Sequence, residues 1–248
     1  YKNFTFKGDP EYVKILSQNS VEVATLANNH MHDYGQQGFE DTVKHLNDVG
    51  VVPIGTDLGN VDSYEYGGGL KYDYSKVVDI KGVKVGILAY KGWNMEEEFL
   101  EKISSDIKRL REKADIITVS YHWGNEGTHQ VNDIQKKLGR YTIDCGADMI
   151  IGHHPHILQG IEKYKDRYIV YSLGNFVFGG NRNPSNKDTI IYQNKFTVNL
   201  TEKKIENIEE NIVPARISST TSFNDYQPIV LEGEEKTRLE EKMIEYNS

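Results

Sequence analysis

The chain has 248 residues, of which 38% are hydrophobic and 27% are charged, so it is long enough for one large domain with a full core. Its net charge of -8 argues against a nucleic-acid-binding surface, because phosphate contacts need clustered Lys and Arg. No apolar run approaches the roughly 20 residues that cross a bilayer, and the single cysteine, Cys145, excludes an internal disulfide.

Apolar residues alternate between helical and strand spacing along the first 175 residues. The first helix is predicted to begin with Asp9 as the N-cap and Pro10 at the first helical position. Strands are predicted at residues 21–26, 51–54, 83–90, 115–121, 149–151 and 168–173. Helical stripes are predicted over residues 39–46, 100–110 and 134–145. Strands that alternate with helices indicate an α/β fold with a parallel or mixed sheet.

The last third of the chain has a different pattern. Residues 189–200 and 205–213 are predicted as antiparallel strands, and residues 234–246 as an amphipathic helix. Residues 179–187 are predicted as an exposed loop, and residues 64–74 as a flexible loop or hairpin. Because no clear linker divides the chain, we predict a single domain over residues 1–248, with residues 188–248 as its C-terminal strands and helix.

Seven of the eight histidines lie in or just after three short segments that each follow a predicted strand. They are His30 and His32, then His122 and His129, then His153, His154 and His156. A fourth segment, around Asn175, follows the next strand and contains no histidine. Because loops at the carboxyl ends of parallel strands meet in one crevice, we expect these segments to share a polar or metal site. An ion held there by imidazoles would polarise a phosphoryl oxygen and lower the pKa of a bound water.

Each of these residues also has a simpler interpretation. A single His after a strand is more often a hydrogen-bonding loop residue than a ligand, and His45 lies on a predicted helix as a solvated or packed side chain. Asn29 and Asn175, taken alone, would be turn residues. Large aromatic residues near the motifs are interpreted as walls of the site or as core, namely Trp123, Phe176 and Phe178.

Four motifs together resemble the CapA/PgsA family of capsule and poly-γ-glutamate biosynthesis proteins in order and spacing. Their residues are Asn28, Asn29, His30, Asp33, Tyr34 and Gly35; Tyr121, His122, Trp123, Gly124 and Glu126; Gly152, His153, His154, Pro155 and His156; and Ser172, Leu173, Gly174, Asn175 and Phe176. The resemblance covers roughly residues 1–178. It implies a metallophosphoesterase-like (calcineurin-like) α/β fold, in which a layered sheet has flanking helices.

The resemblance also implies roles for individual residues. The ligands of a divalent ion (Mn, Zn or Fe) would be Asn29, His122, His154 and His156. His30 would be the general acid for the leaving oxygen. The residues that line the substrate site would be Glu126, Asn175, Trp123 and His153.

One departure from the superfamily pattern concerns the metal. In the superfamily, acidic ligands of the first ion come from strands before the Asn-His motif, and this sequence starts too late to contain them. Asp9 is not a substitute, because it is predicted to cap a helix. We therefore expect the family's N-terminal strands to be missing, the metal to be absent or partly occupied, and hydrolysis to be weak.

Three functions follow from these observations. The first is a capsule or poly-γ-glutamate biosynthesis protein at the outer cell surface, anchored to the membrane outside this chain and working with membrane synthase subunits. The second is a metal-dependent phosphoesterase or related hydrolase that acts on a small phosphorylated substrate. The third is a non-catalytic module that binds an anionic polymer. None of the three has a nucleic-acid partner.

Overall fold

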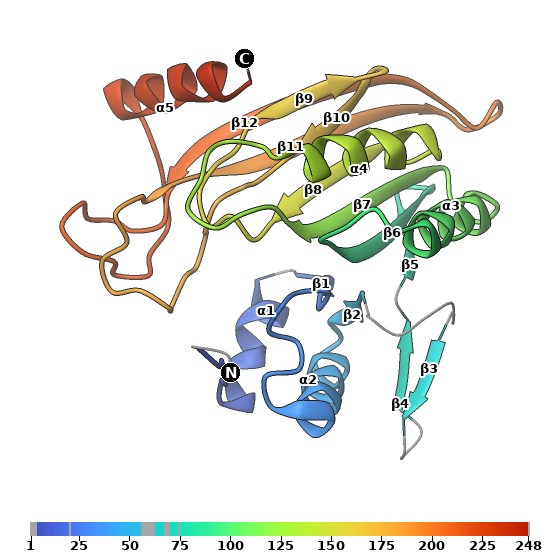
Figure 1. The fold of residues 1–248 in the computed structure, drawn as a ribbon, viewed down its shortest axis with the longest axis horizontal. Coiled ribbons are helices and arrows are strands. Elements are labelled where there is room, and N and C mark those ends of the chain that lie inside the picture. The colour runs from blue at the N-terminus through green and yellow to red at the C-terminus, as the bar shows by residue number, and fades with distance from the viewer. Residues whose placement is uncertain (1–3, 20, 56–62, 67–69, 74, 248) are drawn as a thin grey trace.

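The computed structural model describes residues 4–19, 21–55, 63–66, 70–73 and 75–247. Six strands form the central sheet: β5 (Ser75–Ile80), β6 (Val83–Gly92), β7 (Ile116–Trp123), β8 (Met149–His153), β9 (Ile161–Tyr164) and β10 (Arg167–Val170). Their order is β5-β6-β7-β8-β10-β9 (Figure 1). The four inner strands run parallel, and the two edge strands are antiparallel to their neighbours. The predicted α/β fold with a mixed sheet is confirmed.

Two helices lie side by side over the central sheet, as Figure 1 shows. α3 (Glu97–Arg111) connects β6 to β7, and α4 (Asp133–Asp144) connects β7 to β8. The helices pack on the inner strands through Ile103, Ile107, Leu110 and Leu138, each at most 5% exposed. Burying each of these side chains stabilises the fold by roughly 1.5–3 kcal/mol. The predicted stripe on α3 is thus confirmed at its three buried positions.

The start of α4 decides which of its residues face the sheet. Asn132 and Gln135 form a capping box, in which each side chain accepts a hydrogen bond from the backbone N–H of the other. The buried stripe then runs through Gln135, Leu138 and Thr142. Ile134 was predicted on this stripe, but it lies at its border in the first turn and is 37% exposed. That prediction is wrong for Ile134.

A small parallel sheet forms the N-terminal part of the fold. Its strands are β1 (Val23–Thr25) and β2 (Val52–Ile54), which α2 (Gly35–Asp48) connects. Phe39, Val43 and Leu46 are the buried residues of α2, which confirms the predicted stripe.

Two further N-terminal features match the predictions. The helices η1 (Pro10–Val13) and α1 (Lys14–Gln18) follow a cap in which Asp9 Oδ1 accepts a hydrogen bond from Glu11 N at 3.0 Å. A hairpin of β3 (Ser63–Tyr66) and β4 (Leu70–Asp73) lies in the segment predicted as a loop or hairpin.

The C-terminal third forms an antiparallel sheet of β11 (Asp188–Asn199), β12 (Lys204–Arg216) and β13 (Ile229–Val230), followed by α5 (Gly233–Tyr246). The predicted antiparallel pair and terminal helix are confirmed. These elements pack on β9 and β10 in a second apolar cluster, which includes Val170, Ile190, Leu239 and Met243. The C-terminal elements thus share an apolar cluster with the edge of the central sheet.

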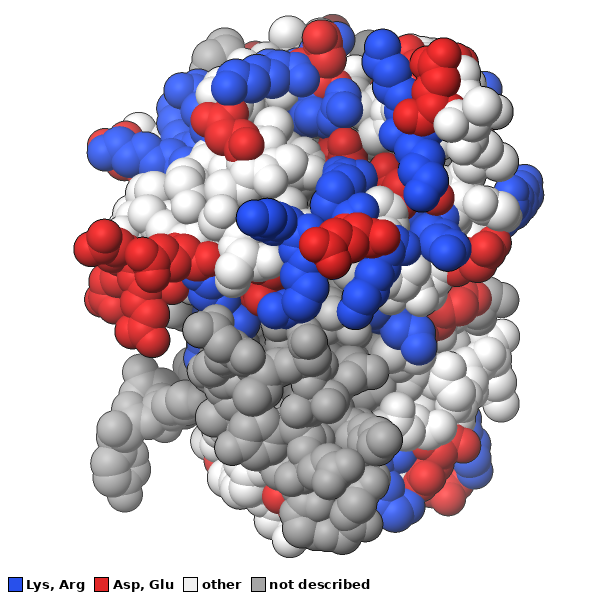
Figure 2. Space-filling view, turned by 90° about the vertical axis from the view of Figure 1, so that its right-hand side faces the viewer, with Lys and Arg blue, Asp and Glu red and all other residues white. Residues whose placement is uncertain are grey.

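Charge is distributed unevenly over the surface. Although the net charge is -8, Figure 2 shows Lys and Arg side chains gathered on one face of the molecule. Lys108, Arg109 and Arg111 lie in the last turn of α3, and Lys76 and Lys113 line a depression together with Arg109. No helix in the described part of the chain is long and apolar enough to span a membrane.

One buried hydrogen bond connects the carboxyl ends of three inner strands. Trp123, the last residue of β7, donates from Nε1 to the carbonyl oxygen of Tyr171, just after β10, at 2.9 Å. The bond passes close to Gly152 of β8, the strand between them. A Cβ atom on Gly152 would lie 2.0 Å from that oxygen and 2.4 Å from Trp123 Nε1, so a side chain does not fit there.

Gly152→Ala is therefore expected to destabilise the fold by about 3 kcal/mol or more, because neither the backbone carbonyl nor the buried indole has room to move. Gly179→Ala is the matched control, since no atom lies within 4 Å of its added Cβ. Its effect should stay below about 0.5 kcal/mol. Denaturant unfolding measures both free energies, and equal stability of the two variants would contradict this account of Gly152.

Candidate functional site

Polar side chains from separate motifs meet at the carboxyl edge of the central sheet. His122 lies near the end of β7 and pairs in register with His153, the last residue of β8. Trp93 directly follows β6, and Asn175 follows β10. The parallel strands thus bring these residues to one place, as expected for loops at the carboxyl ends of such strands.

The histidine rings at this edge are neighbours. The ring centroid of His154 lies 4.7 Å from that of His122 and 6.1 Å from that of His156. Trp93 contacts two of these rings edge-on, at 4.7 Å from His154 and 5.8 Å from His122. Trp93 is absent from the predicted site, although its position one residue after the strand beside β7 could have identified it. We call His122, His154 and His156 the histidine cluster.

The Asn-His motif reaches the same place from the N-terminal sheet. Asn29 Oδ1 lies 2.9 Å from His122 Nε2, so two of the predicted ligand atoms point at each other. Because the amide oxygen is an acceptor, His122 carries its proton on Nε2 in this arrangement. The contact joins the N-terminal sheet to the central sheet at the candidate site.

The buried carboxylate of Asp33 orients the His30 ring. His30 Nδ1 lies 2.8 Å from Asp33 Oδ2, and the same oxygen accepts a hydrogen bond from Phe6 N at 2.9 Å. The Asp33 side chain is only 1% exposed. Asp33 therefore holds the proton on Nδ1 and leaves His30 Nε2 to exchange a proton with a ligand. Neither Asp33 nor Phe6, whose ring lies 4.5 Å from that of His30, has a predicted role.

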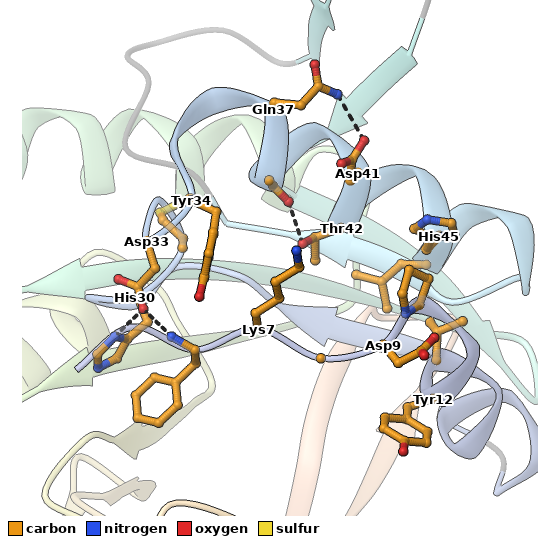
Figure 3. Close-up of a pocket in the computed structure, with 17 residues that line it drawn as sticks. Lys7, Asp9, Tyr12, His30, Asp33, Tyr34, Gln37, Asp41, Thr42 and His45 are labelled. Carbon is orange, nitrogen blue, oxygen red and sulfur yellow. Dashed lines mark hydrogen bonds and ion pairs between the residues drawn. The ribbon is translucent and has the colours of Figure 1, made fainter.

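A cavity of about 520 Å³ opens beside His30, between residues 6–13 and α2. Figure 3 shows the residues at its two ends and Lys7 extended between them: His30, Asp33 and Tyr34 at one end, and Asp9, Tyr12 and His45 at the other. This volume lies within the range of small-molecule pockets. His30 thus has room for a ligand beside it.

Burial keeps the central imidazoles uncharged. Burial, together with repulsion from the neighbouring histidines, lowers the pKa of His122 to about 3. Burial lowers the pKa of His153 to about 4. Burial also lowers the pKa of His154, against the opposite effect of the Glu126 carboxylate. At neutral pH these three rings are therefore neutral, and each has a lone pair on one nitrogen.

The His-Pro-His loop has a strained backbone. His154 and His156 have φ values of 100° and 63°, in a region that residues with a side chain rarely occupy. His154 Nδ1 is also buried without a hydrogen-bond partner among the described residues. Glu126 Oε1 lies 3.9 Å from His154 Nε2, too far for a hydrogen bond. Strain and an unsatisfied polar atom in one residue are typical of functional sites.

His156 is fixed by residues that follow β10. Asn175 Oδ1 lies 2.8 Å from His156 Nδ1, and the ring of Phe178 lies 5.2 Å from the ring of His156. Asn175 therefore lies within the site, and Phe178 forms one of its walls. Asn175 and Phe178 both come from the fourth motif segment or just after it.

The described residues fit a metal ion only in part. Neutral His122 and His154 are donors that Zn, Mn and Fe accept, and His154 Nδ1 has no other partner in the described part of the chain. However, no group of three or more His, Cys, Asp or Glu side chains among the described residues could hold a metal. Because a catalytic zinc has three protein ligands, these residues do not make a complete centre.

Trp123 was expected to line the substrate site, but it lies in the core instead. It is fully buried and stacks on Tyr121 with a ring distance of 4.7 Å. The reason is the alternation of side chains along a strand, which sends Trp123 to the opposite face from His122.

His129 and His45 lie outside the histidine cluster. His129 Nδ1 lies 2.6 Å from the carbonyl oxygen of Leu158, and its ring stacks on Tyr246 at 4.3 Å. His129 therefore attaches the end of α5 to the loop before β9. His45 lies on α2, as predicted.

We expect the purified chain to hold substoichiometric metal after incubation with Mn or Zn, because the described residues supply an incomplete ligand set. Elemental analysis after gel filtration measures the content. His122→Ala should lower it further, whereas the control His45→Ala should not. Stoichiometric metal that survives gel filtration in the unaltered chain would contradict this expectation.

The fold of this chain is similar to that of a solved protein of low sequence identity. A Staphylococcus aureus protein provisionally assigned as a 5'-nucleotidase, solved in complex with alpha-ketoglutarate, matches with a TM-score of 0.56 and 17% identity. The match covers 95% of this chain and 44% of that protein. The expected α/β fold, a layered sheet with flanking helices, is therefore shared with that solved structure.

Similarity in sequence to known proteins identifies the family of this chain. It is 35% identical over 189 residues to the PGA biosynthesis protein CapA of Bacillus subtilis (strain 168), covering 71% of this chain and 48% of that protein. It is 36% identical over 195 residues to the capsule biosynthesis protein CapA of Bacillus anthracis, covering 71% and 45%. The chain thus spans about half the length of these curated relatives. A family model described as bacterial capsule synthesis protein PGA_cap matches residues 1–180, and the chain belongs to this family.

Proposed function

We propose that this chain takes part in the synthesis of a poly-γ-glutamate capsule, at the outer cell surface and together with membrane synthase subunits. The observation that carries the proposal is that the motifs with the family likeness are also the ones whose side chains meet. Asn29 contacts His122, Asn175 contacts His156, and the rings of His122, His154 and His156 are neighbours. His30 lies near enough to His122 and His154 to act electrostatically on both. The two relatives named as CapA proteins support the polymer as the product of the pathway.

The His30–Asp33 pair supports a chemical role in handling the polymer. Because Asp33 occupies Nδ1 of His30, Nε2 is the nitrogen placed for proton transfer to or from a bound chain. Transfer or release of a polymer chain needs such a proton at the atom that leaves. The cavity beside His30 has the volume to hold part of a polymer chain.

A phosphoesterase-like hydrolase is the second candidate, and the His30–Asp33 pair favours it as well. His30 would protonate the leaving oxygen of a small phosphorylated substrate. A bound Mn, Zn or Fe ion would supply positive charge for the phosphoryl group. Its ligands would be Asn29, His122, His154 and His156. This candidate is second because the described residues make an incomplete metal centre.

A non-catalytic polymer-binding module is the third candidate, and the basic face in Figure 2 favours it. The last turn of α3 ends at Arg111, shortly before β7 begins at Ile116, so this face lies at the amino edge of the sheet. The histidine cluster lies at the opposite, carboxyl edge. Reversing charge at Lys108 and Lys113 would therefore weaken polymer binding in this candidate, while His substitutions would not.

Replacing His122 or His156 by Ala in the bacterial gene is expected to lower cell-associated poly-γ-glutamate by about tenfold or more, because loss of a group positioned for catalysis costs at least that much. Glutamate released by acid hydrolysis of extracted capsule measures the polymer. Asn211→Ala, on the exposed surface of the C-terminal sheet, is the matched control and should leave the amount unchanged. A normal capsule in both cluster variants, at normal protein level, would contradict a role for the histidine cluster.

A further inference from the structure

We infer that the loop of residues 217–228 is part of the candidate site, and that Asn224 within it is a positioning residue for His156. We call this segment the C-terminal loop. The family match ends at residue 180, so the C-terminal loop lies outside the segment that carries the family likeness. The inference goes beyond the proposed function, because it assigns a role to residues that no motif contains.

The backbone of His156 needs support from its surroundings. Its φ of 63° is uncommon for a residue with a side chain, and such a conformation persists where neighbouring contacts hold it. The ring is held by Asn175 Oδ1 at 2.8 Å and is flanked by the ring of Phe178 at 5.2 Å. The position of Phe178 therefore limits where the His156 ring can lie.

Asn224 fixes the backbone of the loop that carries Phe178. Its Nδ2 donates to the carbonyl oxygens of Phe178 at 2.8 Å and Asn181 at 3.3 Å. Its backbone N donates to the carbonyl oxygen of Arg182 at 2.8 Å, and its Oδ1 accepts from Tyr226 N at 3.0 Å. Asn224 is only 2% exposed, so its side chain makes these bonds from a buried position, and its loss would remove both side-chain bonds to this loop.

The C-terminal loop has its own internal hydrogen bonds. Asp225 Oδ1 accepts from Ser218 Oγ at 2.8 Å, Ser219 N at 2.9 Å and Gln227 N at 3.2 Å. Arg216, the last residue of β12, donates from Nε to the carbonyl oxygen of Ser218 at 2.9 Å. These bonds attach the C-terminal loop to the C-terminal sheet, and they hold the backbone around Asn224 in one position.

The loop that carries Phe178, held by Asn224, thus forms a fixed wall beside the histidine cluster. Figure 1 shows the C-terminal loop beside the loop that leads from β10 to β11. In that second loop, Phe176 and Val177 are 45% and 68% exposed and directly precede Phe178, whose ring lies beside that of His156. Under the proposed function, on which this step rests, an apolar wall suits a γ-linked glutamate polymer, because its backbone contains methylene groups.

The test is the imidazole NMR spectrum of the chain labelled with ¹⁵N-histidine. Asn224→Ala should shift and broaden the His156 resonances, because the Phe178 ring loses its fixed position, while the His45 resonances stay in place. Amide hydrogen exchange at residues 178–182 should rise about tenfold or more, since their loop loses its anchor. Asn211→Ala is the matched control, because Asn211 Nδ2 bonds Gln193 Oε1 at 2.7 Å on the exposed surface of the C-terminal sheet.

Faster exchange in Asn224→Ala with unchanged His156 resonances would overturn the inference. If Asn224→Ala does not fold, the milder variant Asp225→Asn tests the inference. Because it weakens the internal bonds of the C-terminal loop, it should shift the His156 resonances in the same direction. Unchanged His156 resonances in Asp225→Asn, with faster exchange in the C-terminal loop, would overturn it equally. Failure of the unaltered chain to bind poly-γ-glutamate would contradict the proposed function alone, because the NMR comparison needs no polymer.

Discussion

The hydrogen bond from the Trp123 indole to the carbonyl oxygen of Tyr171 spans β8 at Gly152, the point where that strand has no side chain. It fixes the ends of β7, β8 and β10 relative to one another in the interior of the protein. The histidine cluster depends on this arrangement, because His122 precedes Trp123 by one residue and His154 follows Gly152 by two. Buried hydrogen bonds of this kind add geometric specificity as well as stability, since an unmade one would leave an indole N–H without a partner.

Charge in the site is controlled by burial in one part and by a carboxylate in another. Burial holds His122 and His154 neutral, so they offer lone pairs and N–H groups instead of positive charge. His30, by contrast, lies against the Asp33 carboxylate at the mouth of a cavity, where a proton can be exchanged. The site therefore combines a neutral polar surface with one group suited to proton transfer. This combination is compatible with chemistry on an acidic polymer, whose own charge would be repelled by extra carboxylates in the site.

Sequence periodicity predicted the four inner strands of the central sheet and the helices that cover it, but not the edge strands β5 and β9. It also predicted the meeting of the motifs, because parallel strands place their carboxyl ends at one edge. The resemblance to the CapA/PgsA family is confirmed by the family match. The side-chain environment was harder to predict. His122 and Trp123 are adjacent, yet one faces the site and the other the core, and only the position of the neighbouring layers decides which. Asn224 was missed because its contact with Phe178 joins residues 46 positions apart that share no local pattern.

The central claim is that the histidine cluster handles the capsule polymer. Its most direct test is a titration of the ¹⁵N-histidine-labelled chain with poly-γ-glutamate, followed through the imidazole resonances. The account predicts that His30, His122, His154 and His156 shift together, while His129, which lies outside both the histidine cluster and the cavity beside His30, does not. Shifts confined to His129, or saturable binding that moves no resonance of the cluster, would contradict it.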